Sequence, residues 1–173
     1  MPDQREKISV LMVCLGRSPM AEAVLKHQIS QRPEIQERFE ISVDSAGTGA
    51  YHEGDSADSR TVAVCRKHKV PISCIARAVT KDDFTKFDYI LAMDQNNLQT
   101  LLHRQPSSSK SHVTLFGSFD PSIPLSSIGS NKIKARAIDD PYYGGKDGFE
   151  SSFKLCEAFA GGFLDYLERK ERR

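Results

Sequence analysis

The chain has 173 residues, of which 39% are hydrophobic and 27% charged, and its formal net charge is +1. This length favours one domain, residues 1–173, and the small net charge gives no sign of a nucleic-acid or anionic membrane partner. No apolar run approaches the roughly 20 residues of a membrane span, and the polar start Met1–Lys7 is unlike a secretory signal. We therefore expect a cytoplasmic protein whose four cysteines are reduced.

Strands and helices alternate along the sequence. Short apolar runs followed by turn residues predict the strands, and apolar positions at helical spacing predict the helices. In chain order we expect a strand at Ile8–Cys14, a helix at Ser18–Ile29, a strand at Phe39–Ala46, a helix at Ala57–His68, a short helical turn at Thr80–Phe84, a strand at Tyr89–Met93, a helix at Gln95–His103, a strand at Val113–Phe116 and a helix at Phe149–Arg172. This alternation predicts an α/β fold, in which helices flank both faces of a four-stranded parallel sheet.

Several polar or reactive side chains stand where the predicted strands end. Cys14, Ser45 and Asp94 each lie at the end of a strand. Ligands of such sheets bind beyond the carboxyl ends of the strands, so we expect the functional site there. The long connection Gly117–Ala137, with its serines, prolines and lysines, is predicted to be an irregular loop.

The segment Val13–Pro19 carries the most specific chemistry of the chain. Cys14 closes a buried strand, Gly16 and Arg17 follow, and Ser18 with Pro19 begins a helix. Backbone N–H groups of such a turn and the N-terminus of the helix attract a phosphate and favour a thiolate. A cysteine at a strand end is otherwise most often a core residue. The segment therefore predicts a phosphate-binding cysteine.

The chain resembles the low-molecular-weight protein tyrosine phosphatases over nearly its whole length. The matching segments are Val13–Gly16, Arg17–Ala23, Val43–Thr48, Phe87–Asp94 and Asp140–Gly144, in the order of the family. The resemblance implies hydrolysis of phosphotyrosine proteins and of small aryl phosphates, without a metal or an organic cofactor. It leaves the oligomeric state open.

The resemblance also implies roles for individual residues. Cys14 would be the nucleophile that forms a phosphocysteine, Arg17 would bind two phosphate oxygens, and Asp140 would protonate the leaving group and then activate water. The substrate would be bound by Leu15, Gly16, Tyr142, Tyr143 and Ser18, whose hydroxyl would also hydrogen-bond the thiolate. Ser45 and Asp94 would support the site.

The phosphate-binding loop is shorter than in the family. The family has five residues between the cysteine and the arginine, whereas only Leu15 and Gly16 separate Cys14 from Arg17, so the segment Asn-Ile-Cys is absent. Fewer backbone N–H groups remain to surround a phosphate. Three explanations stay open: a catalytically impaired relative that acts as a binding protein, a boundary error in the gene model, or a loop that is still active.

Two further departures concern the surroundings of this loop. A histidine common in the family is replaced by Cys74, and the stretch Ser122–Arg136 before Asp140 is longer than in many members. An arsenate reductase of the same fold is a second alternative to a phosphatase. It would need two more redox cysteines, for which Cys65 and Cys74 are the candidates.

Overall fold

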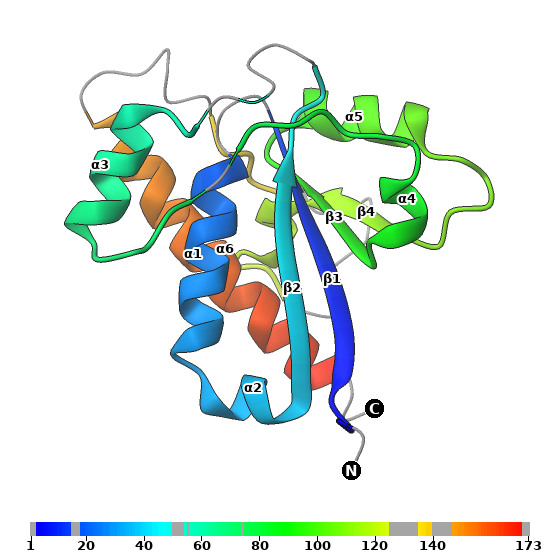
Figure 1. Cartoon of the computed structure of the whole chain (residues 1–173), viewed down its shortest axis with the longest axis horizontal. Coiled ribbons are helices and arrows are strands. Elements are labelled where there is room, and N and C mark those ends of the chain that lie inside the picture. The colour runs from blue at the N-terminus through cyan, green and yellow to red at the C-terminus, as the bar shows by residue number, and fades with distance from the viewer. Residues whose placement is uncertain are drawn as a thin grey trace.

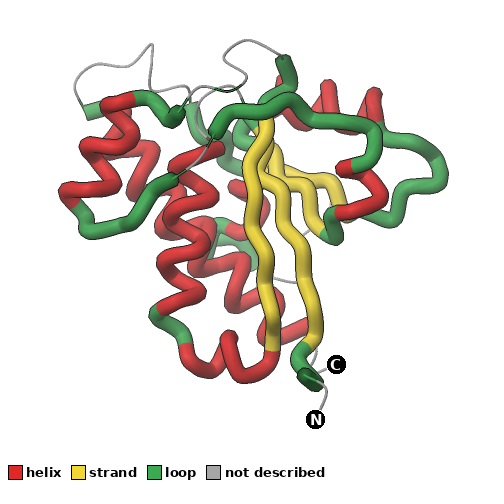
Figure 2. Tube along the Cα trace, in the orientation of Figure 1, coloured by secondary structure: helices red, strands yellow, loops and turns green. Residues whose placement is uncertain are grey.

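The computed structural model describes residues 3–14, 18–49, 54, 56–73, 75–124, 135–139 and 147–170. Its centre is a parallel sheet with the strand order β2-β1-β3-β4. The strands are β1 (Glu6–Val13), β2 (Phe39–Ala46), β3 (Tyr89–Ala92) and β4 (His112–Leu115). Figures 1 and 2 show these strands side by side, and every neighbouring pair is parallel.

Helices cover both faces of this sheet, as the sequence predicts (Figure 1). They are α1 (Ser18–Ser30), α2 (Pro33–Arg38), α3 (Ser59–Lys67), α4 (Asp83–Lys86), α5 (Gln95–Arg104), the 3-10 helix η1 (Phe116–Phe119) and α6 (Gly148–Lys170). Helices α1, α3 and α6 lie together on one face, and α4 and α5 lie on the other. The predicted α/β class with a four-stranded parallel sheet is thereby confirmed.

The expected elements are present, with small differences at their ends. Strand β2 has the predicted bounds, whereas α3 begins two residues later than predicted because Asp58 caps it and accepts a hydrogen bond from the Arg60 amide at 2.8 Å. Two short elements, α2 and η1, were not predicted. Helix α2 has only six residues, and η1 contains Gly117, so neither shows a clear helical pattern.

The burial of strand β1 on both faces of the sheet explains why its sequence is an almost continuous apolar run. Its alternate side chains point to opposite faces of the sheet. Val10 and Met12 belong to the core that includes α1, α3 and α6, whereas Leu11 and Val13 belong to the core beneath α4 and α5. The segment Val10–Val13 is buried on both sides and therefore carries an apolar residue at every position.

The four strands end at the same level. Val13 is in register with Ala46 on one side and with Ala92 on the other, and Ala92 is in register with Leu115. Backbone hydrogen bonds continue just past this row, since the Cys14 amide donates to the Ala46 carbonyl at 3.1 Å. The residues that follow each strand therefore share one edge of the sheet, which we call the carboxyl edge.

Candidate active site

Cys14 lies at the carboxyl edge, directly after the central strand β1. Its side chain is buried, with an exposed fraction of 1%. The backbone amide of Ser18, the first residue of α1, donates a hydrogen bond to the Cys14 Sγ at 2.8 Å. An N–H donor and the positive end of a 13-residue helix both favour negative charge on this sulfur. These two features favour a thiolate at Cys14, and its role as the nucleophile stays a prediction.

Ser18 contacts this site in a different way from the expected one. The contact with the Cys14 sulfur is made by the backbone amide of Ser18, whereas the Ser18 hydroxyl donates to the carbonyl of Ala46 at 3.4 Å. Ser18 is buried, with 3% of its surface exposed. The residue therefore joins the start of α1 to the ends of both β1 and β2.

Ser45 is hydrogen-bonded to a carboxylate that the sequence analysis did not single out. Its hydroxyl donates to Glu22 of α1 at 2.7 Å, and both side chains are buried. The other oxygen of Glu22 accepts from Lys26, one helical turn later, at 2.8 Å. The bond from Ser45 joins the first turns of α1 to β2, whereas the bond from Lys26 lies within α1. A charged residue within the buried run Met20–Leu25 is the sequence signal that could have revealed Glu22.

Asp94 follows the end of β3 and acts as the N-cap of α5. Its Oδ1 atom accepts a hydrogen bond from the backbone amide of Asn97 at 2.8 Å. This bond satisfies one of the free amides at the start of α5. Asp94 thereby fixes the direction in which the chain leaves β3 at the carboxyl edge.

A second segment is attached to β3 at the same place. Residues 135–139, which we call the strap, run past the end of this strand. The Ile138 amide donates to the carbonyl of Met93 at 2.8 Å, and the Met93 amide donates to the carbonyl of Val13 at 3.2 Å. Because Val13 directly precedes Cys14, two hydrogen bonds connect the strap to the strand that carries the cysteine.

The loop after β2 is held by an ion-pair network around Arg77. Its guanidinium lies 3.1 Å from a carboxylate oxygen of Asp44 and 2.9 Å from one of Asp83. Burial disfavours a charged Asp83, but hydrogen bonds from Arg77 and Thr80 outweigh it, so the pKa of Asp83 is lowered. The Arg77 carbonyl accepts from the amide of Gly47 at 2.8 Å, which connects this network to the carboxyl edge.

Cys65 does not have the features of a second reactive cysteine. It is fully buried in α3, and burial raises the pKa of its thiol to about 11. Only a thiolate attacks a disulfide or a substrate, so this thiol is unreactive in the folded protein near neutral pH. This burial counts against the arsenate reductase alternative, in which Cys65 would take part in redox chemistry.

Several expected site residues lie outside the described part of the chain. They are Leu15, Gly16, Arg17, Asp140, Tyr142 and Tyr143, together with Cys74 and residues 125–134 of the longer stretch. The structure therefore brings Cys14, Ser18, Ser45 and Asp94 to one edge of the sheet, and the functional roles of all the expected site residues stay predictions.

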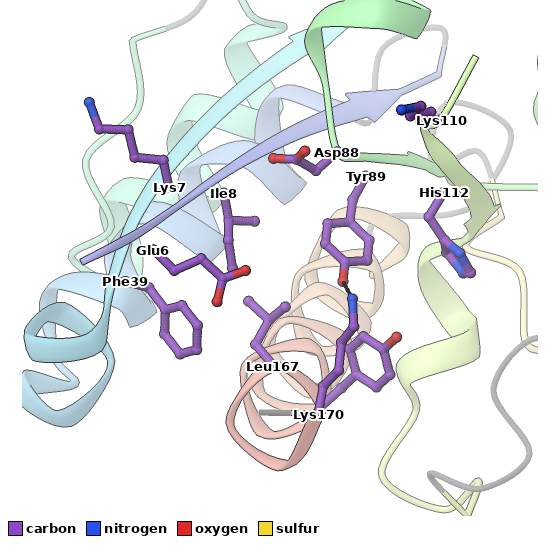
Figure 3. Close-up of a pocket in the computed structure, with 11 residues that line it drawn as sticks. Glu6, Lys7, Ile8, Phe39, Asp88, Tyr89, Lys110, His112, Leu167 and Lys170 are labelled. Carbon is purple, nitrogen blue, oxygen red and sulfur yellow. Dashed lines mark hydrogen bonds between the residues drawn. The ribbon is translucent and has the colours of Figure 1, made fainter. Parts of the chain in front are cut away.

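A cavity of about 320 Å³ lies at the opposite, amino ends of the strands (Figure 3). Its lining includes Glu6 at the start of β1, Tyr89 at the start of β3, and Lys170 at the end of α6. The Lys170 ammonium donates to the Tyr89 hydroxyl at 3.2 Å. Burial raises the pKa of Tyr89, so this phenol remains neutral near pH 7. The cavity is separated from Cys14 by the length of β1 and is not part of the candidate active site.

Among the described residues, no group of three or more His, Cys, Asp or Glu side chains is placed to hold a metal ion. No helix in the part of the chain that the structure describes is long and apolar enough to cross a membrane.

Comparisons with known proteins identify the family of the chain. The family model for low molecular weight phosphotyrosine protein phosphatase matches residues 9–173. The chain is similar to the proteins of that name from Schizosaccharomyces pombe (41% identity; 92% of this chain and 96% of the relative) and Homo sapiens (39%; 95% and 98%). It is also similar to the crystal structure of a protein tyrosine phosphatase from Entamoeba histolytica with Hepes in its active site (TM-score 0.80, 36% identity; 95% of this chain and 99% of that one). The chain therefore belongs to the low molecular weight phosphotyrosine protein phosphatase family.

Proposed function

We propose that this protein hydrolyses phosphotyrosine through a phosphocysteine formed on Cys14. The observation that carries the proposal is the placement of the Cys14 sulfur. It lies at the carboxyl edge of the sheet and accepts a hydrogen bond from the first amide of α1 at 2.8 Å. Membership of a family of phosphotyrosine phosphatases supports the same reaction.

The proposed reaction has two steps. In the first, the Cys14 sulfur attacks phosphorus, the bond from phosphorus to the phenolic oxygen breaks, and Asp140 gives that oxygen its proton. Arg17 binds two oxygens of the phosphoryl group and stabilises the charge of the transition state. In the second, Asp140 takes a proton from water, the water oxygen attacks phosphorus, and Cys14 leaves as a thiolate.

The described residues would support both steps by holding the nucleophile in place. The Ser18 amide stabilises the thiolate before attack and when it leaves. The Ser45 hydroxyl and Glu22 keep the start of α1 against β2. We further propose that small aryl phosphates are substrates, that Leu15, Gly16, Tyr142 and Tyr143 contact them, and that the enzyme acts in the cytoplasm.

The first experiment measures turnover of phosphotyrosine and of 4-nitrophenyl phosphate by the chain as written and by its Cys14→Ser variant. We expect turnover by the chain, and we expect the substitution to reduce it to the uncatalysed rate. Cys65→Ser is the matched control, because this buried thiol has a pKa raised to about 11 and lies in α3. Equal rates for the chain and Cys14→Ser would refute the proposal.

The short link between Cys14 and Arg17 raised the alternative of a binding protein, and nothing in the structure or the comparisons favours it. A measurement of phosphate binding beside this turnover assay separates the two functions. Binding of inorganic phosphate without turnover, and turnover restored by inserting Asn-Ile-Cys after Gly16, would identify an impaired phosphatase. Acid quenching during turnover, followed by detection of phosphate on Cys14, tests the covalent intermediate directly.

A further inference from the structure

The strap passes over η1 at a distance that only glycine permits. A Cβ atom built on Gly117 would lie 1.6 Å from the Arg136 carbonyl oxygen and 2.7 Å from its carbon. Contacts under 3.0 Å essentially never occur for a real Cβ, and the obstacle here is backbone rather than a flexible side chain. Any other residue at position 117 would therefore have to push η1 and the strap apart.

Helix η1 has no room to move away from the strap. On its other side, the Phe119 carbonyl oxygen lies against Gly162 of α6, where a Cβ would be only 1.7 Å away. The buried rings of Phe116 and Phe119 pack edge-on against Phe159 and Phe163 of α6, with centroid distances of 5.6 Å and 5.0 Å. A larger residue at position 117 would consequently displace the strap rather than η1.

The strap is the segment that leads to Asp140. Its Ile138 side chain is completely buried, and the Ile138 amide donates to the Met93 carbonyl at 2.8 Å. Asp140 follows Ile138 by two residues, and two residues span at most about 7 Å. Asp140 itself lies outside the described residues, and a shift of the strap at Arg136 would act on the chain just before it.

We propose that Gly117 is a positioning residue for the general acid: its missing side chain lets the strap lie against η1, which sets the place from which Asp140 reaches the leaving group. This inference rests on the proposed function, in which Asp140 is the acid. Misplacing a catalytic group by about 1 Å can cost about 100-fold in rate. Only substrates whose leaving group needs a proton would show the full loss.

The test compares kcat/KM for phenyl phosphate, a poor leaving group, with kcat/KM for 4-nitrophenyl phosphate, a good one. We expect Gly117→Ala to lower the first about 10- to 100-fold and the second by about 3-fold or less. Leu167→Ala is the control, since it removes buried packing from the opposite end of the molecule. It should leave the ratio of the two values unchanged.

A second measurement separates positioning from general damage. In an Asp140→Asn background, Gly117→Ala should add no further dependence on the leaving group, because the group it positions no longer donates a proton. Exchange of the Ile138 amide proton should become faster in Gly117→Ala and stay unchanged in Leu167→Ala. If Gly117→Ala does not fold, Ile138→Ala loosens the same strap, and it should show the same dependence on the leaving group.

Each outcome bears on one claim. If Asp140→Asn depends on the leaving group but Gly117→Ala lowers both values equally, or leaves Ile138 exchange unaltered, the positioning role is wrong and the proposed function stands. If Asp140→Asn shows no dependence on the leaving group, or turnover does not require Cys14, the proposed function fails and this inference fails with it.

Discussion

Two adjacent glycines of α6 should respond in opposite ways to the same substitution. Gly161 and Gly162 both lie in the interior of this 23-residue helix. Alanine is the better helix former, and replacing an interior glycine with it stabilises a helix by about 0.5–1 kcal/mol. Helix propensity alone therefore predicts that Gly161→Ala and Gly162→Ala are both more stable than the unchanged chain.

Packing distinguishes the two positions. A Cβ on Gly161 would meet only the side-chain ends of Arg32 and Gln28, each at an ordinary 3.5 Å. A Cβ on Gly162 would lie 1.7 Å from the Phe119 carbonyl oxygen and 2.9 Å from its carbon. Overpacking typically costs about 1–3 kcal/mol, and a clash with backbone belongs at the upper end. Subtracting the helical gain of about 1 kcal/mol leaves Gly162→Ala less stable by about 2 kcal/mol.

Urea denaturation of the two variants beside the unchanged chain tests this difference. We expect the midpoint to rise slightly for Gly161→Ala and to fall clearly for Gly162→Ala, with equal slopes m. In thermal unfolding, a loss of about 2 kcal/mol corresponds to a Tm lower by about 4–8 °C for a chain of this size. If Gly162→Ala matched Gly161→Ala, the close approach of η1 to α6 would be refuted.

Two further predictions concern the polar contacts around the carboxyl edge. Because the folded pKa of Asp83 is lowered, the stability from its contact with Arg77 is complete above about pH 4 and is lost as the pH falls through the folded pKa. In thermal unfolding, Asp83→Asn should therefore be less stable than the unchanged chain at pH 7 and should lose less stability as the pH is lowered. Parallel curves of Tm against pH for the two proteins would contradict this. Ser45→Ala removes a hydrogen bond from the buried Glu22 carboxylate and should cost about 1–3 kcal/mol in urea denaturation, whereas Ser45→Thr, which keeps the hydroxyl, should cost less.

The sequence by itself determined the class of the fold and the edge of the sheet at which Cys14, Ser45 and Asp94 lie. The apolar run of β1 predicts a strand that is buried on both faces of the sheet. The structure agrees, since alternate residues of this strand belong to the two hydrophobic cores. The position of Cys14 between that run and the start of a helix could also be predicted, because both signals come from residues next to it in the sequence. The end of β2 and the cap at Asp94 follow from the same kind of pattern.

Only the tertiary structure decided which distant residues meet. Glu22 is a helical residue by sequence, and its bond to Ser45 depends on how α1 packs against β2. The strap begins in the stretch Gly117–Ala137, which the sequence predicted to be irregular, yet its Arg136 lies against Gly117 and the next residues lead to the bond from Ile138 to Met93. These contacts join segments separated by about 20 residues or more, and no local pattern encodes them. The packing of η1 between the strap and α6 sets the distances between these three segments, because close-packed backbones fit together at only one separation.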